Sequence, residues 1–220
     1  MARPKITPKN QRRQNINILL ICDGRTEINY AKYVLNSCVS SKSNTIKIDA
    51  RKLNSIEAAQ KHILICPTSF DAVFFLTDLE NTQLSETKIN SLITLQNSAK
   101  KLSNKRTKWA VFFNYPSIEY WYILHFAERA KSFMNATEAK NFLKQKYSIY
   151  EKPMPRNRQE AEIFCAKLES AIINCNNLNT TGHLLPYANR ITSHIPLTNP
   201  MTEMPNLIDM IKKTKPTNKN

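Results

Sequence analysis

A buried strand that runs directly into a helix carrying an acid constrains the fold of this chain more than any other feature. Residues 110–113 read AVFF, a continuous apolar run typical of a strand covered on both faces. In the sequence that follows, Asn114 suits a helix N-cap and Pro116 suits a first helical turn. Glu119 then falls in the first turn, where the helix dipole favours a carboxylate. This junction predicts an acid at the C-terminal edge of an α/β sheet, where such sheets bind ligands.

Two earlier apolar runs, 16–22 and 72–76, are also followed at once by acids. Because the carboxyl ends of parallel strands meet at one edge, we expect the acids at these junctions to lie together. They are Asp23, Glu27, Asp78, Glu80 and Glu119. Glu27 has a second interpretation, as an ordinary first-turn acid that complements the helix dipole.

Carboxylates gathered at one edge repel one another, and a hard divalent cation that takes oxygen ligands relieves the repulsion. We therefore expect Mg²⁺ or Mn²⁺ at this edge. The candidate metal ligands are Asp23, Asp78, Glu80 and Glu119. The candidate catalytic residues are Asp23, Glu27, Asp78 and Glu119. A metal held in this way can polarise a phosphoryl oxygen and activate water for in-line attack.

The order of the remaining elements predicts the fold class. Strands and helices alternate up to residue 128, which predicts a mostly parallel sheet with helices on both faces. The expected strands are Ile16–Cys22, Thr45–Ala50, Ala72–Leu76 and Ala110–Phe113, and later helices are expected at 135–147, 158–174 and 203–213. We expect a basic arm over 1–14, an α/β core over 15–128, and a helical and irregular extension over 129–220 packed on the core.

The net charge of +15 indicates a polyanionic partner, with nucleic acid as the leading candidate. Arg51 and Lys52 follow a strand and therefore lie at the same edge as the acids. Arg156 and Arg158, in the loop EKPMPRNR, are further candidates for binding the nucleic-acid backbone. The alternative is a protein whose positive surface has no specific partner.

Several classes of site are disfavoured. The five cysteines are odd in number and lack a CxxC pair, which argues against a disulfide framework and a cysteine zinc site, and favours a reducing, cytoplasmic setting. No run approaches about 18 apolar residues, so we expect no membrane span. A G-x-x-x-x-G-K-[ST] loop is missing, which disfavours ATP binding in that mode. His125, on the inner face of an apolar helix, is expected to be a core residue rather than a ligand.

Four segments resemble motifs of the RloB-like family of bacterial and archaeal proteins. ILLICDGRTEINY is similar to the family's strand followed by E-G-x-x-T-E and a tyrosine, and FFLTDLEN is similar to its D-x-D segment. NYPSIEYWYILHF resembles its N-P-S-F-E-x-W-L-L-x-H-F signature, and NPMTEMPNLIDMI resembles its N-P-S-T before a final helix. The resemblance implies a Toprim-like, Rossmann-like fold. It also implies a metal-dependent nuclease, often encoded beside an ATPase in phage-defence or restriction loci.

Carried over by position, the resemblance makes Asp23 the general acid or base, Asp78 and Glu80 the metal pair, and Glu119 a further acid of the site. The chain also departs from the family pattern. Asp23 stands where the family has Glu, Glu80 stands where it has Asp, the first turn is one residue shorter, and Tyr115 interrupts the N-P-S spacing. Each acid exchange changes the reach of a side chain by one methylene.

The sequence therefore predicts a Mg²⁺- or Mn²⁺-dependent nuclease acting on DNA or RNA in prokaryotic anti-phage defence, together with an ATPase partner. The alternative is a non-catalytic module that binds nucleic acid, a nucleotide or a partner protein through a degenerate acidic site. A ribosome- or RNA-associated basic protein without a site is a third interpretation. Helices within 130–200 are candidates for a homodimer interface or a substrate clamp.

Overall fold

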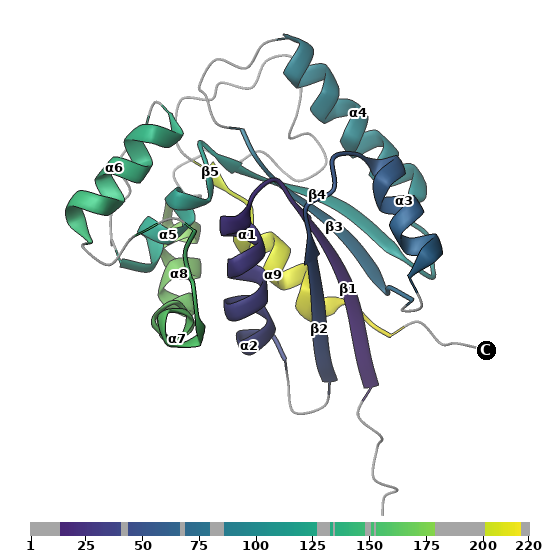
Figure 1. Ribbon diagram of the computed structural model, residues 1–220, viewed down its shortest axis with the longest axis horizontal. Helices are drawn as coiled ribbons and strands as arrows, with labels where there is room; N and C mark the ends of the chain where they lie inside the picture. The colour runs from purple at the N-terminus through teal and green to yellow at the C-terminus, as the bar shows by residue number, and fades with distance from the viewer. Residues whose placement is uncertain are drawn as a thin grey trace, which may run out of the picture.

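A five-stranded sheet forms the centre of the molecule (Figure 1). The computed structural model describes residues 14–40, 44–66, 69–79, 86–126, 133, 135–147, 151, 153–178 and 201–216. The strands are β1 (Gln14–Cys22), β2 (Asn44–Arg51), β3 (Ala72–Asp78), β4 (Lys108–Tyr115) and β5 (Met201–Thr202), in the spatial order β2-β1-β3-β4-β5. β1 to β4 are mutually parallel and β5 runs antiparallel to β4, which confirms the predicted mostly parallel α/β sheet.

Helices cover both faces of this sheet. The first helical segment consists of α1 (Arg25–Tyr30), the π-helical stretch η1 (Ala31–Leu35) and α2 (Asn36–Cys38). The others are α3 (Ile56–Ile65), α4 (Glu86–Leu102), α5 (Ile118–Phe126), α6 (Ala136–Lys146), α7 (Arg158–Ala166), α8 (Leu168–Leu178) and α9 (Met204–Lys213). The helix expected over 158–174 is thus divided at Lys167 into α7 and α8. In the described parts of the chain, no helix is long and apolar enough to cross a membrane.

The strands read as continuous apolar runs because each of them serves two apolar layers. In β1, Ile18 and Leu20 join a cluster with residues of the first helical segment, α5, α7, α8 and α9. Leu19 and Ile21 point the other way and join a second cluster with α3 and α4. Alternate residues of a strand face opposite sides, so a sheet covered on both faces needs apolar residues at every position.

The C-terminal helices share the first of these layers with the core helices. Phe164 of α7, Leu168 of α8 and Leu207 of α9 belong to the same buried cluster as Tyr122 of α5. In Figure 1, α9 lies behind the sheet in yellow, while α7 and α8 lie beside α5. The extension therefore packs its apolar faces on the side of the sheet that carries α1 and α5.

The strand order creates a switch point between β1 and β3. The chain leaves β1 towards β2 on one side and later returns to β3 on the other side. Open α/β sheets bind their ligands in the crevice at the carboxyl ends of strands at such a point. Asp23 follows the end of β1 and Asp78 ends β3, so both acids lie beside this crevice.

Three sequence-based expectations are corrected here. Asn114 is not a helix N-cap, because β4 continues through it and α5 begins only at Ile118. Pro116 precedes that helix instead of occupying its first turn. The stretch between the helices expected at 158–174 and 203–213, which belonged to the irregular part of the expected extension, contains the end of α8 and the short strand β5, whereas residues 179–200 lie outside the described part.

The sequence argued against a disulfide framework, but the structure contains a disulfide. Cys38 at the end of α2 and Cys165 in α7 form a disulfide, with their Cα atoms 6.1 Å apart and 127 residues between them in sequence. The bond connects the first helical segment to the C-terminal extension. The other cysteines, Cys22, Cys66 and Cys175, take no part in a disulfide.

Candidate functional site

Asp78 lies at the centre of the acidic edge, and both of its carboxylate oxygens are held by backbone or side-chain donors. Its Oδ1 accepts a hydrogen bond of 3.1 Å from Nδ2 of Asn114 in β4. Its Oδ2 accepts one of 3.2 Å from the backbone N–H of Ile118, the first residue of α5. The free N–H groups of a first helical turn favour an anion. The junction between β4 and α5 therefore positions the carboxylate that ends β3.

Two further carboxylates act on Asp78. Burial raises the pKa of Asp78 well above its ordinary value, and the negative charges of Glu27 and then Glu119 raise it further, while the hydrogen bonds from Asn114 and Ile118 lower it. Glu27 is 5% exposed and Glu119 is 0% exposed. Glu27 and Glu119, which come from the other two strand-to-helix junctions, therefore lie close enough to Asp78 for their charges to act on it.

Gly24 gives the Glu27 carboxylate its place. The backbone at Gly24 is extended, with φ −140°, so the glycine is not needed for a left-handed conformation. A Cβ atom at this position would lie 2.8 Å from Oε2 of Glu27. The glycine therefore allows the carboxylate of the first turn of α1 to fold back against the end of β1.

Asp23 lies at the same edge but is held by β3. Its Oδ2 accepts a 3.1 Å hydrogen bond from the backbone N–H of Asp78 and another from the hydroxyl of Thr77. The residue is exposed to solvent. Burial raises the pKa of the neighbouring Cys22 thiol, and the charges of Glu27, Asp23 and Asp78 raise it further, so all three carboxylates lie near the end of β1.

The described residues offer few ligands for a metal. Among them, no three His, Cys, Asp or Glu side chains are arranged to hold a metal ion. Glu80, the other half of the expected metal pair, lies outside the described residues. Mg²⁺ usually binds through one or two carboxylates and completes its shell with water and substrate phosphate. The donor set therefore fits a cation bound through few carboxylates, not one enclosed in a protein cage.

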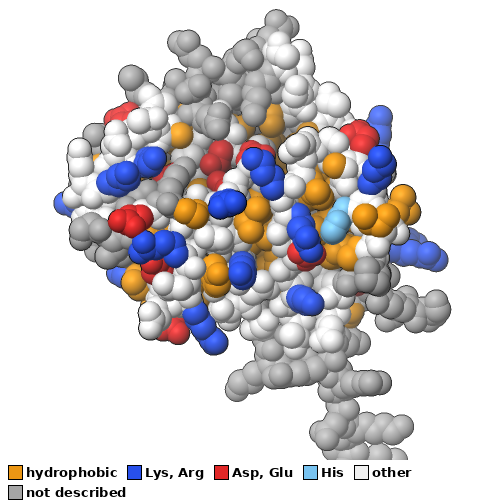
Figure 2. Space-filling view, viewed as in Figure 1, with side chains coloured by type: hydrophobic (Ala, Val, Ile, Leu, Met, Phe, Trp, Pro, Cys, Tyr) orange, Lys and Arg blue, Asp and Glu red, His pale blue; other side chains and the backbone are white. Residues whose placement is uncertain are grey.

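Space-filling Figure 2 shows acidic side chains in a hollow near the start of α1, with Lys and Arg side chains close to them. Arg51 ends β2 opposite Ile21 of β1, at the carboxyl edge as expected. Its Nε lies 2.8 Å from a carboxylate oxygen of Asp49, so an acid already neutralises this guanidinium. Lys52, the next residue, is exposed to solvent.

The two arginines of the later loop are separated in space. Arg156 forms ion pairs of 2.6 Å with both Glu151 and Glu160. Its loop lies beside the start of α1, because the Tyr122 hydroxyl donates to the carbonyl of Met154 at 2.7 Å and also contacts the carbonyl of Thr26 at 3.4 Å. This places the backbone next to Arg156 near the acidic edge.

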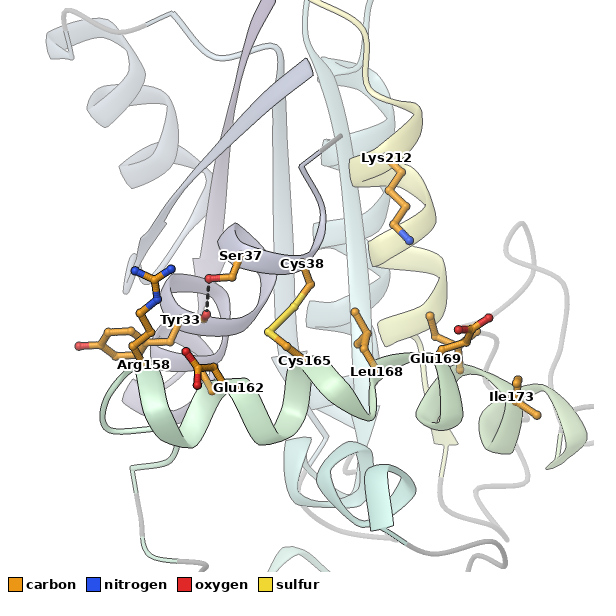
Figure 3. Close-up of a pocket in the computed structure, with 12 residues that line it drawn as sticks. Tyr33, Ser37, Cys38, Arg158, Glu162, Cys165, Leu168, Glu169, Ile173 and Lys212 are labelled. Carbon is orange, nitrogen blue, oxygen red and sulfur yellow. Dashed lines mark hydrogen bonds between the residues drawn. A yellow bond between two sulfur atoms is a disulfide. The ribbon is translucent and has the colours of Figure 1, made fainter. Parts of the chain in front are cut away.

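Arg158 instead lines a separate groove of about 800 Å³ between the first helical segment and the helices α7 and α8 (Figure 3). Tyr33, Leu168 and the disulfide of Cys38 and Cys165 line the same groove. Figure 3 shows the disulfide crossing from one helix to the other. The acids of the sheet edge do not line this groove, so Arg158 lies apart from them.

His125 is a core residue, as expected. The Trp121 indole N–H donates to the Tyr30 hydroxyl at 2.8 Å, which leaves that hydroxyl to donate to Nε2 of His125 at 3.2 Å. The other ring nitrogen, Nδ1, therefore carries the proton and donates to the carbonyl of Trp121 at 2.9 Å. Both ring nitrogens are engaged within the α1 and α5 layer.

Sequence reasoning missed the polar residues that arrive from the C-terminus. Thr202 of β5 donates to Oδ1 of Asn114 at 2.7 Å. Glu203 forms two hydrogen bonds with Phe113 of β4. Its backbone N–H donates to the Phe113 carbonyl at 3.0 Å, and its Oε2 accepts the Phe113 N–H at 2.9 Å. The N-P-M-T-E segment was the available signal, but nothing in its spacing indicated that it pairs with the strand before α5.

Comparison with known proteins gives one clear result. The family model described as RloB-like protein matches residues 18–211, which include the end of β1, the acidic edge, β5 and most of α9. Comparison with curated proteins and with solved structures gave no match. The matched range covers most of the chain and agrees with the motifs in its first, middle and last parts. The chain therefore belongs to the RloB-like protein family.

Proposed function

We propose that this protein is a nuclease that cleaves phosphodiester bonds of DNA or RNA with the help of Mg²⁺ or Mn²⁺. The observation that carries the proposal is that two buried acids, Glu27 and Glu119, lie close enough to Asp78 for their negative charges, after burial itself, to raise its pKa. A site that concentrates buried negative charge in this way is prepared for a cation. The crevice at the switch point of the sheet is where a ligand is expected.

The roles of the residues follow from their positions. The proposed metal ligands are Asp78, whose two carboxylate oxygens each accept a hydrogen bond, and Glu119 at the start of α5. Asp23 and Glu80 are further candidates. A bound divalent ion would polarise the phosphoryl oxygen and lower the pKa of a water molecule. Asp23 is exposed and so remains accessible for proton transfer at the edge. Glu27, in the first turn of α1, adds its negative charge to that of the carboxylates that would bind the cation.

The positive charge of the chain supports a polyanionic substrate. With a net charge of +15, the protein attracts nucleic acid over a distance set by the ionic strength. Lys52 is exposed beside the acidic edge, and Arg156 lies on the loop next to α1. These cations would contact phosphates on either side of the cleaved bond. Arg51 and Arg156 would each have to exchange ion pairs for contacts with phosphate, Arg51 its pair with Asp49 and Arg156 its pairs with Glu151 and Glu160. Arg158 is the weakest candidate, because it lines the separate groove.

The cellular setting forms part of the same proposal. The resemblance to RloB-like proteins associates the chain with anti-phage defence and with an ATPase partner. Such a partner would control cleavage, because an uncontrolled nuclease harms its own host. The isolated protein is therefore expected to bind metal before it shows strong cleavage.

One observation favours a second candidate, a non-catalytic module that binds nucleic acid, a nucleotide or a partner protein. Within the described ranges, no three His, Cys, Asp or Glu side chains are arranged so that they could hold a metal ion. In this interpretation the acids serve as a docking surface. The two candidates differ in whether the acids bind a divalent cation.

The test is calorimetric titration of the protein with Mn²⁺. We expect saturable binding that both Asp78→Asn and Glu119→Gln weaken by at least about tenfold, since each removes a proposed ligand. Asp209→Asn is the matched control, because Asp209 is an exposed acid on α9 that pairs with Lys213. If Mn²⁺ does not bind, or if the control variant weakens binding equally, the nuclease proposal is contradicted and the non-catalytic binding module is the candidate that remains.

A further inference from the structure

Three polar residues of neighbouring strands form a row across the sheet beside the acidic edge. Asp78 of β3 is the register partner of Asn114 in β4, and Asn114 is the register partner of Thr202 in β5. Register partners point to the same face of a sheet. Their side chains are therefore neighbours on the face that carries α1 and α5, although the chain positions span 78 to 202.

The hydrogen bonds along this row have a fixed direction. The Thr202 hydroxyl accepts the backbone N–H of Met204 at 3.2 Å and donates to Oδ1 of Asn114 at 2.7 Å. With its oxygen engaged there, the Asn114 amide turns its Nδ2 to Asp78, 3.1 Å from Oδ1. Asn114 is 0% exposed and Thr202 is 1% exposed, so water cannot readily replace either partner.

We propose that Asn114 and Thr202 are positioning residues that fix the orientation of the Asp78 carboxylate, and that the segment starting at β5 is therefore part of the site. The inference rests on the proposed function, in which Asp78 is a metal ligand. Metal and catalytic sites tolerate misplacement of roughly 0.5 Å. A carboxylate oxygen that accepts one hydrogen bond from an amide still has a second lone pair with which it can bind a cation.

The C-terminal segment of β5 and α9 is held in place by hydrogen bonds and apolar packing, which keeps Thr202 beside Asn114. Glu203 binds both the N–H and the carbonyl of Phe113, next to Asn114, through its side chain and its backbone. Leu207 and Ile211 of α9 are buried in the apolar layer below. Displacement of this segment would release the amide of Asn114 and, with it, one of the two donors that hold Asp78.

The experiment compares Mn²⁺ binding by Thr202→Val, Thr202→Ser and the wild type. Valine keeps the shape of threonine but cannot donate to Asn114, whereas serine keeps the hydroxyl. Thr214→Val is the matched control, because Thr214 is a mostly buried threonine beyond α9 whose hydroxyl donates to Met210 instead. We expect Thr202→Val to raise the dissociation constant about 10–100-fold, as loss of residues that orient metal ligands does. We expect Thr202→Ser and Thr214→Val to stay within about twofold of the wild type, because both leave the row intact.

Other results overturn the inference in distinguishable ways. A folded Thr202→Val protein with wild-type affinity shows that the row does not position Asp78. Equal weakening by Thr202→Val and Thr214→Val shows a general loss of packing. If the wild type itself binds no Mn²⁺, the proposed function fails and this inference fails with it. If Thr202→Val does not fold, Asn114→Ser removes the bridging amide directly and must weaken binding to the same extent.

Discussion

Protonation of His125 should destabilise this protein as the pH falls. Burial lowers the pKa of His125 from 6.5 to about 3, the hydrogen bond to the Trp121 carbonyl raises it, and the charge of Lys167 lowers it. The neutral ring is required because Nε2 accepts the proton of the Tyr30 hydroxyl. An imidazolium would place two donors against each other in the core.

The magnitude follows from proton linkage. Between pH 6.5 and 3 the unfolded chain binds a proton at this histidine and the folded chain does not, so the free energy of unfolding falls as the pH is lowered. Each pH unit in this window costs about 1.4 kcal/mol. Lowering the pH from 7.5 to 5 should therefore remove about 2 kcal/mol, since only the part below 6.5 contributes.

Urea unfolding of the wild type and of His125→Gln at both pH values measures this contribution. Glutamine can accept the Tyr30 proton and does not titrate, so the variant should lose about 2 kcal/mol less than the wild type on acidification. His62→Gln is a control for the substitution itself, made in α3 on the other face of the sheet. The same pH dependence in the wild type and in His125→Gln would refute the assignment of a buried, neutral His125.

Three further predictions concern the site and the extension. Gly24→Ala should weaken Mn²⁺ binding about tenfold in calorimetry, because the added methyl lies 2.8 Å from Oε2 of Glu27 and displaces that carboxylate; unchanged affinity would contradict this. Thiol titration in denaturant without reductant should find three thiols per chain, not five, because Cys38 and Cys165 are joined. Because the bond closes a loop of 127 residues, its reduction should lower the free energy of unfolding in urea by about 5 kcal/mol. Lys52→Ala should reduce the slope of log affinity against log salt for duplex DNA by about 0.9, whereas an equal slope would exclude a phosphate contact.

The sheet was predictable because its strands are buried on both faces. A run such as AVFF in β4 contains no alternating polar residues, because apolar clusters cover both faces of the strand. The ends of elements were less predictable. β4 continues to Tyr115, two residues beyond its apolar run, and α7 ends before Lys167 although the helical pattern continues. Local propensity does not determine where tertiary contacts stop an element.

The acids of the site were predictable from topology alone, since each follows a parallel strand. The role of Asn114 was not, because it depends on a partner that returns from 88 residues away. Asn114 is a residue type that often caps a helix, but its side-chain amide instead accepts a hydrogen bond from Thr202 and donates one to Asp78. Glu80 stays a prediction, since it lies outside the described residues.

The disulfide shows a limit of counting cysteines. Cys38 and Cys165 belong to no spacing motif, and an odd total argued against pairing. Their Cα atoms come within 6.1 Å because α7 packs against the first helical segment, which the sequence does not reveal. Pairing depends on this distance and not on the number of cysteines.

The shorter acid at position 23 bears on whether the site is intact. Asp23 stands where the family pattern has Glu, which shortens the side chain by one methylene. In the structure its Oδ2 reaches two donors of β3, the Thr77 hydroxyl and the Asp78 N–H. The short acid is therefore held in one defined place, next to the residue that the other carboxylates surround. In the proposed nuclease, a carboxylate that transfers protons has to lie at a set distance from the reacting atoms, and the two hydrogen bonds to Oδ2 of Asp23 would meet that requirement.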